Sequence, residues 1–299
     1  MTPRAALGTI ATARLAATPP GGRCITTSTT PTTLTAAQAR DYAAYVSPLV
    51  SGFHAPFFKL ASVQPGERVL DIGCGPGDTT IEAAQRSGPT GEVLGIDIAP
   101  AFVALAQERG LEAGSRARFA VMDAQALDLP SSYWDVIVCH LAIDAFDDPR
   151  AALQEFVRVL RPVGRLAIAT WGEAERSPWL GFALEGARAV AAGRPSVAKS
   201  RPFRYGASGV LSNLLAENGF GDVTPDRVST SLDYPQADAY WQAVERGLAG
   251  TIEPFGGLSS EQRAAAREAV APELRKWRYP RSEAVHPPLQ AFLAVAAKE

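Results

Sequence analysis

The sequence contains few of the side chains that build disulfide frameworks and metal sites. It has three cysteines, Cys24, Cys74 and Cys139, and three histidines among 299 residues. An odd number of widely spaced cysteines argues against a disulfide framework and predicts reduced thiols. Cysteines and histidines at these spacings also match no zinc-binding pattern, so we expect no metal site.

A strong net charge and a long apolar run are absent as well. The 29 Lys and Arg against 31 Asp and Glu give a formal net charge of -2, whereas a dedicated nucleic-acid binder needs a basic surplus to contact phosphates. No run approaches the roughly 18 apolar residues that a membrane-spanning helix needs. With 46% hydrophobic residues, the chain can bury a large core. We therefore expect a soluble globular protein without nucleic-acid or membrane partners, and its oligomeric state is unknown.

Residues 1–40 differ in composition from the rest of the chain. They contain four arginines and no lysine or acidic residue, so they carry a charge of +4 and the rest carries -6. Their abundant threonine and proline bury little surface, which is typical of a disordered leader. An acid-free start rich in arginine and hydroxyl groups is also typical of organelle transit peptides. We expect a cytoplasmic protein, or an organellar one if residues 1–40 are a targeting segment.

From residue 41 onward, short apolar strands alternate with helical segments. The first five strands are expected at 68–72, 93–96, 118–122, 136–139 and 166–170. Helical segments are expected at 41–62, 79–85, 100–109 and 149–160. Short buried strands that alternate with helices indicate a parallel sheet covered by helices on both faces. Beyond residue 171 the pattern loosens, with helices near 179–192, 209–218, 237–248 and 260–277 and strands near 223–232 and 289–297.

The residues that end or follow the first five strands are suited to binding a ligand. They are Asp71, Asp97, Asp123, His140 and Trp171. Ligands of such sheets bind beyond the carboxyl ends of the strands, so these side chains predict one site. Asp135 is expected at the opposite end of its strand and is excluded from that site.

The loop after the first strand, Gly73-Cys74-Gly75-Pro76-Gly77, indicates which cofactor the site takes. A dinucleotide fingerprint has its third glycine where this chain has Asp78, and NAD would place a pyrophosphate at this helix start, next to acidic side chains. S-adenosylmethionine (SAM) has no phosphate and carries a sulfonium and an ammonium group, which tolerate nearby carboxylates. Asp97 lies 20 residues after Gly77, where an acid accepts hydrogen bonds from ribose hydroxyls. An NAD-dependent oxidoreductase remains a less favoured alternative.

Five blocks in this order resemble those of class I SAM-dependent methyltransferases. They are VLDIGCGPG at 69–77, GIDI at 95–98, MDA at 122–124, YWDVI at 133–137 and VLRPVGR at 159–165. The chain is most similar to the ubiquinone/menaquinone-biosynthesis-like subgroup of small-molecule methyltransferases, and the resemblance covers about residues 41–175. It implies a Rossmann-like, seven-stranded, mostly parallel sheet in a domain spanning 41–299, with inserted lid helices near 41–60, 176–206 and 236–280. Val163 stands where the family commonly has glycine, which we interpret as a turn variant.

The resemblance also implies the residues that contact SAM. They are Asp71, Gly73, Cys74, Gly75, Gly77, Asp97, Ile98, Asp123, Ala124 and His140. The glycines would surround the methionine part, with Asp71 near its ammonium group. Asp97 would bind the ribose, and Ile98, Asp123 and Ala124 would contact the adenine.

His140 is the candidate catalytic residue, because it is the one histidine expected at a carboxyl strand end. A pKa near neutrality suits an imidazole to take a proton from a hydroxyl nucleophile, although His140 would otherwise only line the pocket. Tyr45 and Trp171 are the candidate acceptor contacts, whereas His54 is expected on a helix surface. A basic stretch is expected to be a solvated loop or to contact an anionic acceptor, and consists of Arg194, Lys199, Arg201 and Arg204.

The expected reaction is an in-line displacement that moves the methyl group of SAM to an O, N or C atom of a small molecule. No metal is required, and a base is needed only if the nucleophile starts protonated. The segment 139–146 departs from the subgroup's glutamine-rich run, which leaves open a SAM-binding protein of this fold without methyl-transfer activity. A nucleic-acid methyltransferase is disfavoured by the acidic body of the chain.

Overall fold

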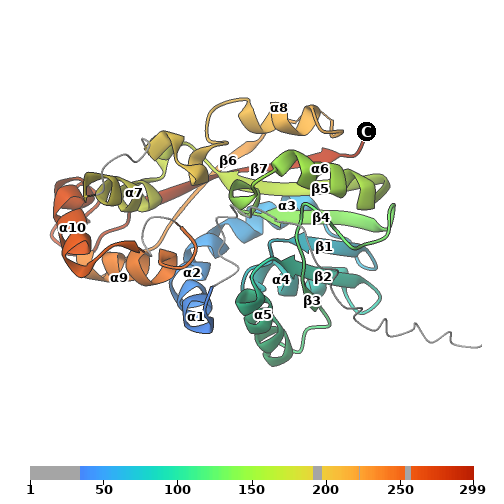
Figure 1. Cartoon of the computed structure of the whole chain (residues 1–299), viewed down its shortest axis with the longest axis horizontal. Helices are drawn as coiled ribbons and strands as arrows, with labels where there is room; N and C mark the ends of the chain where they lie inside the picture. The colour runs from blue at the N-terminus through green and yellow to red at the C-terminus, as the bar shows by residue number, and fades with distance from the viewer. Residues whose placement is uncertain (1–33, 191–196, 222, 253–256) are drawn as a thin grey trace, which may run out of the picture.

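The computed structural model describes residues 34–190, 197–221, 223–252 and 257–299, and a seven-stranded sheet lies at its centre (Figure 1). The strand order is β3-β2-β1-β4-β5-β7-β6. The strands are β1 (Arg68–Ile72), β2 (Glu92–Asp97), β3 (Arg118–Val121), β4 (Trp134–His140), β5 (Leu160–Trp171), β6 (Asp226–Ser231) and β7 (Pro288–Ala297). β7 runs antiparallel to β5 and β6, and the other pairs are parallel. The predicted seven-stranded, mostly parallel sheet is confirmed.

Helices cover both faces of the sheet, and the strand sequences show why. In β4, Val136 and Val138 belong to one apolar cluster, whereas Ile137 and Cys139 belong to the other. Both faces are therefore buried, which explains why the strand is a continuous apolar run rather than an alternating one. The first cluster includes residues of α3 (His54–Ala61) and α4 (Asp78–Ser87), and the second those of α6 (Pro149–Val159) and α8 (Val210–Ala216).

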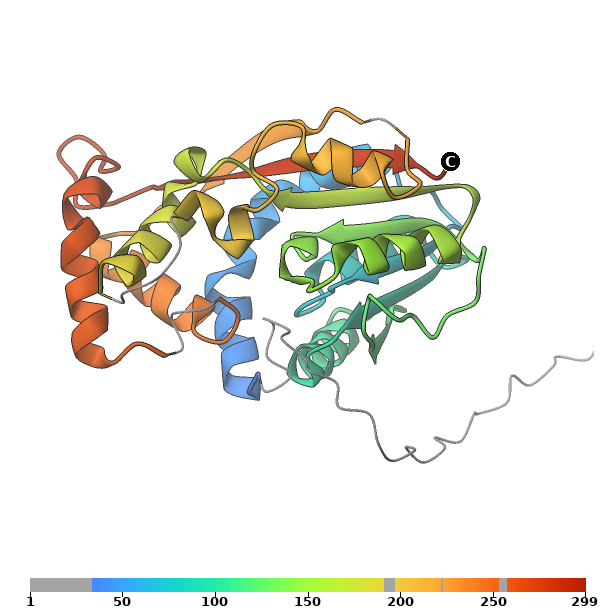
Figure 2. The ribbon, with the colours of Figure 1, turned by 45° about the horizontal axis from the view of Figure 1, so that its top comes forward.

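The remaining α-helices gather mainly at the carboxyl ends of the strands. They are α1 (Ala36–Tyr45), α2 (Ser47–Val50), α5 (Pro100–Glu112), α7 (Pro178–Val190), α9 (Ala237–Leu248) and α10 (Ser260–Arg275). Figures 1 and 2 show α7, α9 and α10 side by side at one end of the molecule, with α1 and α2 between this group and the sheet. α2, α7, α9 and α10 lie within the segments predicted as lid elements and α1 overlaps one of them, whereas α5 lies outside them and contacts β2 and β3. No described helix is both long and apolar enough to cross a membrane.

The described fold includes residues that precede the predicted boundary at residue 40. Thr35 and Gln38 form a capping box at the start of α1: the Thr35 hydroxyl oxygen accepts from the Gln38 N–H, and the Gln38 side chain accepts from the Thr35 N–H. Leu34 is buried with Phe102 and Leu105 of α5. Residues 34–40 are thus part of the fold, and the boundary at residue 40 is wrong, because polar residues typical of disorder serve here as a helix cap. Residues 1–33 lie outside the described residues.

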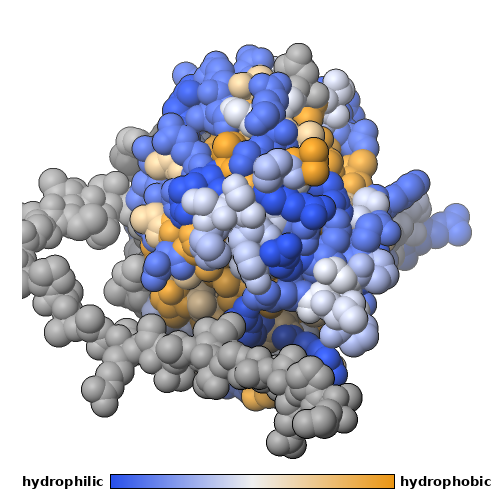
Figure 3. Space-filling view, turned by 90° about the vertical axis from the view of Figure 1, so that its right-hand side faces the viewer, coloured by the Kyte–Doolittle hydropathy of each residue, from blue (hydrophilic) through white to orange (hydrophobic). Residues whose placement is uncertain are grey.

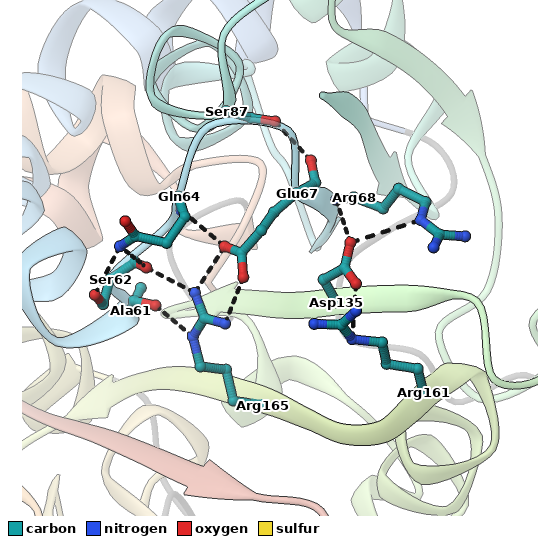
Figure 4. Close-up of polar contacts among 9 residues, drawn as sticks. All are labelled: Ala61, Ser62, Gln64, Glu67, Arg68, Ser87, Asp135, Arg161 and Arg165. Atoms are coloured by element: carbon teal, nitrogen blue, oxygen red, sulfur yellow. Dashed lines mark hydrogen bonds and ion pairs between the residues drawn. The ribbon is translucent and has the colours of Figure 1, made fainter. Parts of the chain in front are cut away.

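Two ion-pair clusters join the amino ends of the strands (Figure 4). The Arg165 guanidinium donates to both Glu67 carboxylate oxygens at 2.8 Å and to the carbonyls of Ala61 and Ser62 at 2.7 Å. Asp135 accepts from the Arg68 N–H at 2.7 Å and pairs with Arg161, whose Nε lies 2.7 Å from its Oδ1. Asp135 therefore lies at the end of the sheet predicted from the sequence. It fixes the strand starts rather than contacting a ligand.

The turn inside β5 contains a strained and exposed valine. Val163 has φ +60° and is 84% exposed. A β-branched residue is rarely found in this left-handed region, where its side chain crowds the backbone. Figure 3 shows the side of the molecule that lies on the right in Figure 1, where hydrophilic residues make up most of the visible described surface. The structure thus explains why this turn suits glycine.

We predict that Val163→Gly stabilises the protein by about 1 kcal/mol. The relief of left-handed strain, about 1–2 kcal/mol, exceeds the entropic cost of a glycine. The measurement is urea unfolding, with Val121→Gly as the matched control. Val121 is also exposed but its φ is not positive, so its replacement should destabilise. Equal destabilisation by both substitutions would contradict the strain at Val163.

Candidate active site

A pocket of about 400 Å³ lies beyond the carboxyl ends of the strands. Its volume lies in the range typical of cofactor and ligand sites. One end is formed by the loop from Gly73 to Thr79 and by residues that follow β2 and β3. The other end is formed by residues after β4 and β5 and by the helical segments. The predicted strand-end residues Asp97, Asp123, His140 and Trp171 all line this single pocket.

The three loop glycines have positive φ values, but they serve different purposes. A Cβ on Gly73 would lie 2.3 Å from that of Ala142, and one on Gly77 would lie 3.0 Å from that of Ala106. A Cβ on Gly75, with φ +51°, would meet no atom within 4 Å. Gly73 and Gly77 therefore allow close packing of the loop. Gly75 instead leaves its backbone open to the pocket, whereas Gly77 does not line the pocket, contrary to its predicted contact with SAM.

Asp97 connects the end of β2 to the glycine loop. Its Oδ2 accepts from the Gly75 N–H at 3.0 Å, and its Oδ1 accepts from the Ala99 N–H at 2.9 Å. Burial raises its pKa, and these backbone donors oppose the rise. Each carboxylate oxygen can accept more than one hydrogen bond. Asp97 can thus also accept from a ligand hydroxyl, as predicted for ribose.

Asp71 lies beneath the loop rather than in the pocket lining. Its Oδ2 accepts from the Thr80 hydroxyl at 2.6 Å, while the buried Oδ1 has no hydrogen-bond partner among the described residues. Burial raises its pKa to about 7, the Thr80 hydrogen bond opposes this, and Asp97 and Asp78 raise it further. The predicted position of Asp71 near the ammonium group of SAM stays a prediction, and Asp71 would act there from beneath the loop. A cationic ligand above the loop would still stabilise the charged form of Asp71.

Asp78, the residue that breaks the dinucleotide fingerprint, links three elements. Arg109 of α5 donates to both of its oxygens, at 2.6 and 3.0 Å, and Ser47 of α2 donates to Oδ2 at 2.8 Å. Arg109 also donates to the Pro76 carbonyl at 2.8 Å. Burial raises the pKa of Asp78, but Arg109 and Ser47 lower it more, and the net shift is downward. The acid thus fixes the glycine loop against the helices that cover the pocket.

The residues predicted to contact the adenine lie together in the pocket. Ile98, Asp123 and Ala124 all line it, next to Gln125. Asp123 Oδ1 accepts from the backbone and side-chain N–H groups of Gln125, at 2.9 and 3.1 Å. Cys74 also lines the pocket. Burial raises the pKa of its thiol well above the usual value, so Cys74 is a packing residue and not a nucleophile.

The aromatic residues expected to contact the acceptor divide into two cases. Trp171 lines the pocket, and Trp179 lies in the same wall. Tyr45 does not line the pocket. Instead, Arg246 of α9 lies over the Tyr45 ring at 4.9 Å and donates to its hydroxyl at 2.7 Å. Tyr42 takes its place in the lining. The prediction for Tyr45 is corrected accordingly.

The helical spacing of residues 41–62 explains the error for Tyr45. That segment carries two stripes spaced by four residues. One contains Tyr45 and the buried core residues Leu49, Phe53 and Phe57. The neighbouring stripe faces the pocket and consists of Tyr42, Val46, Val50 and His54. The more apolar stripe packs into the core. The neighbouring stripe is therefore the sequence feature that could have identified the pocket residues.

Two residues of the basic stretch contact backbone carbonyls. Arg201 donates to the Ala145 carbonyl at 2.9 Å and to the Asp147 carboxylate at 2.6 Å. Arg204 donates to the carbonyls of Ile143 and Phe146 at 2.8 Å. These bonds fix the segment after β4, which forms part of the pocket wall. A solvated loop is thus the wrong prediction for Arg201 and Arg204, while Arg194 lies outside the described residues.

His140 ends β4 and lines the pocket, as predicted. Burial, together with the neighbouring His54, lowers its pKa to about 3. Such an imidazole stays uncharged at neutral pH and accepts protons weakly. Its environment therefore supports a role in lining the pocket and argues against His140 as the catalytic base.

The comparisons with known proteins agree with this site. A family model described as a methyltransferase domain matches residues 64–190. Nocamycin O-methyltransferase of Saccharothrix syringae is 33% identical over 214 residues, covering 62% of this chain and 75% of that protein. The chain belongs to the SAM-dependent methyltransferase family. The resemblance seen in the five sequence blocks is confirmed, and SAM is the methyl donor of this enzyme.

Two further matches define how far the likeness extends. The ubiquinone/menaquinone biosynthesis C-methyltransferase UbiE of Ralstonia pickettii is 32% identical over 139 residues, covering 42% of this chain and 57% of that protein. This match therefore spans little more than half of that relative. A putative methyltransferase from Bacillus halodurans has a TM-score of 0.57 at 15% identity, covering 82% of this chain and 97% of that one. It shares the fold of this methyltransferase.

We predict that alanine at Gly75 and at Gly77 affects the methyltransferase differently. At Gly75 the new methyl group meets no protein atom and enters the pocket. It should cost about 1–2 kcal/mol of stability for the left-handed backbone and weaken SAM binding by at least tenfold. At Gly77 the methyl group would crowd Ala106, so stability should fall further while SAM binding by the folded fraction changes little. Thermal unfolding and calorimetric titration measure the two effects, and equal losses of SAM affinity would contradict these separate roles.

Proposed function

We propose that this enzyme transfers the methyl group of SAM to a small, partly apolar molecule. The observation that supports this most directly is the chemical difference between the two ends of one pocket. The glycine loop, Asp97 and Asp123 supply polar groups at one end. Trp171, Trp179 and Leu180 lie at the other. A polar cofactor and an apolar acceptor can therefore meet in the middle.

The residues at the polar end fit SAM. The open space above Gly75 allows a ligand to approach the loop backbone closely. Asp97 retains acceptor capacity for ribose hydroxyls, and Ile98 and Ala124 flank the region proposed for the adenine. The unpartnered Oδ1 of Asp71 and the neighbouring acids favour a cationic ligand over a pyrophosphate. When bound, SAM supplies an activated methyl group on a positively charged sulfur.

The relatives support an acceptor of small size. Their names describe an O-methyltransferase for nocamycin and a C-methyltransferase in ubiquinone and menaquinone biosynthesis. The apolar walls of the pocket suit an acceptor with an aromatic or aliphatic body. A cytoplasmic location remains our proposal from the sequence, with the organellar alternative if the leader directs transport. The buried free thiols of Cys74 and Cys139 are compatible with a reducing compartment.

Calorimetric titration with SAM, S-adenosylhomocysteine and NADH tests the cofactor assignment. We expect the two sulfur compounds to bind and NADH not to bind. Asp97→Asn should weaken binding by at least tenfold, about 1.4 kcal/mol, because the charged acceptor for the ribose is lost. Asp135→Asn is the matched control, since Asp135 is also buried and accepts a backbone N–H but lies at the opposite end of the sheet. It should leave the affinity for SAM unchanged.

A second measurement separates methyl transfer from SAM binding alone. The enzyme is incubated with methyl-labelled SAM and a panel of small phenols, quinols and amines. Label in a methylated acceptor supports the proposed function. Tight SAM binding with no label transferred to any class of acceptor would favour a SAM-binding protein without this activity. Binding of NADH in place of SAM would contradict the cofactor assignment itself.

A further inference from the structure

A second histidine, His54, reaches the pocket from a helix, whereas His140 reaches it from the end of a strand. His54 is the first residue of α3 and lines the same pocket as His140. The two rings meet edge to face, with centroids 4.9 Å apart. The His54 side chain is 12% exposed. It is thus a pocket residue and not the helix-surface histidine that the sequence suggested.

Glu82 of α4 orients the His54 ring. Its Oε2 lies 3.2 Å from His54 Nδ1. Because a carboxylate accepts a hydrogen bond, this contact favours the tautomer with the proton on Nδ1. Nε2 then keeps its lone pair, and it has no hydrogen-bond partner among the described residues. Arg86 donates to the other oxygen of Glu82 at 2.7 Å, so the carboxylate is itself fixed in position.

The charges around His54 set its state at neutral pH. Burial lowers its pKa, Glu82 and Asp78 oppose this, and Arg86 lowers it further, so the net shift is downward. The imidazole is therefore uncharged near neutral pH and can accept a proton. His140, the other titratable group against its ring, stays neutral as well. His54 is the better proton acceptor of the pair, because Glu82 stabilises its charged form, whereas no carboxylate of the described residues pairs with His140.

The other titratable groups of the pocket are less suited to accepting a proton. Asp78 is paired with Arg109 through both oxygens. Asp144 is buried, and burial raises its pKa well above the usual value, while Arg204 opposes the rise. Asp97 accepts two backbone N–H groups at the cofactor end. His54 remains as a neutral base beside the apolar wall.

We propose that His54 is the catalytic base for an acceptor that presents a phenolic or enolic hydroxyl, and that Glu82 is its positioning residue. This proposal rests on the proposed methyl transfer to a small molecule. The hydroxyl proton passes to Nε2 of His54. An electron pair of the acceptor forms the new bond to the methyl carbon. The C–S bond breaks and its electron pair remains on sulfur, so the sulfonium becomes a neutral thioether while the positive charge passes to the imidazole.

The chemistry of the site selects this acceptor class. A histidine with a lowered pKa removes protons efficiently only from groups that are themselves fairly acidic, because transfer from an alkyl alcohol is strongly uphill. A phenol or enol meets that requirement, and its planar body suits the apolar wall that contains Trp171 and Trp179. An amine acceptor would need no such base once it is uncharged.

The test uses 4-nitrophenol as the probe, because its phenolate absorbs visible light. The protein is saturated with S-adenosylhomocysteine, and the ionised fraction of bound 4-nitrophenol is measured between pH 5 and 8. In the wild type, we expect this fraction to exceed that of free 4-nitrophenol at the same pH. His54→Asn should abolish the excess. With 4-nitrophenol and SAM as substrates at pH 6, where most of the free phenol is protonated and needs a base, it should lower kcat by about 10²- to 10⁴-fold.

Glu82→Gln separates positioning from a merely structural role. Removing the carboxylate takes away an influence that raises the pKa of His54. In the wild type, activity should rise with pH as His54 loses its proton. The midpoint of this rise should lie below the ordinary histidine pKa of about 6.5. In Glu82→Gln this rise should move to still lower pH and kcat should fall by about tenfold. Nitrogen-15 NMR of His54 should show the lower pKa and the loss of the Nδ1-protonated tautomer.

Glu155→Gln is the matched control. Glu155 also lies on a helix and pairs with an arginine, Arg158, but no histidine of the described residues contacts it. The Glu155→Gln substitution should leave the pH profile of activity and the spectrum of bound 4-nitrophenol unchanged. An unaltered spectrum in His54→Asn, or failure of 4-nitrophenol to bind the saturated enzyme, would overturn the proposal while leaving the methyltransferase function intact. Failure of S-adenosylhomocysteine itself to bind would instead contradict the proposed function.

Discussion

The hydrogen bond from the Gly75 N–H to the Asp97 carboxylate is the constraint on which the site depends. Together with the bond from the Cys74 N–H to the Ile96 carbonyl, 2.8 Å long, it joins the loop after β1 to the end of β2. This connection requires β1 and β2 to be parallel neighbours, so that their carboxyl ends coincide. The same loop then positions Asp78, which binds α2 through Ser47. Two carboxylates thus act in sequence: Asp97 links the sheet to the cofactor loop, and Asp78 links that loop to α2 and α5.

The charges at this edge of the sheet explain the choice of cofactor better than the glycine spacing does. Asp71, Asp78 and Asp97 lie close enough to influence one another's ionisation, and Arg109 is engaged with Asp78. Burial disfavours the charged form of Asp71 and Asp97 until a positive group approaches. A sulfonium and an ammonium group would relieve this cost, whereas a pyrophosphate would increase it. Asp78 in place of a third glycine is therefore part of the specificity and also a structural link.

The sequence predicts what is local and leaves open what depends on packing between distant segments. The strands and the glycine loop can be predicted from the sequence, because an apolar run followed by glycines determines its own conformation. The assignment of Tyr45 fails because two stripes share the spacing of four residues, and only the packing of α9 decides which one faces the pocket. His54 and Glu82 lie 28 residues apart on different helices, so no local pattern indicates that they meet. The strain at Val163 likewise becomes visible only when its φ is known.

The division of the pocket explains why this family can share a donor and differ in acceptor. Residues 64–190, which match the family model, include the loop, Asp97, Asp123 and His140. Much of the opposite wall comes from outside that range, from Tyr42 to His54, Ser200 to Pro202, and Leu248 to Ile252. Substitutions in those segments would change that wall, but Ser47 among them also donates to Asp78 and thereby fixes the glycine loop. His54 belongs to this opposite wall, whereas its partner Glu82 lies within the range that matches the family model. The proposed base is therefore assembled from two segments, only one of which lies in the matched range.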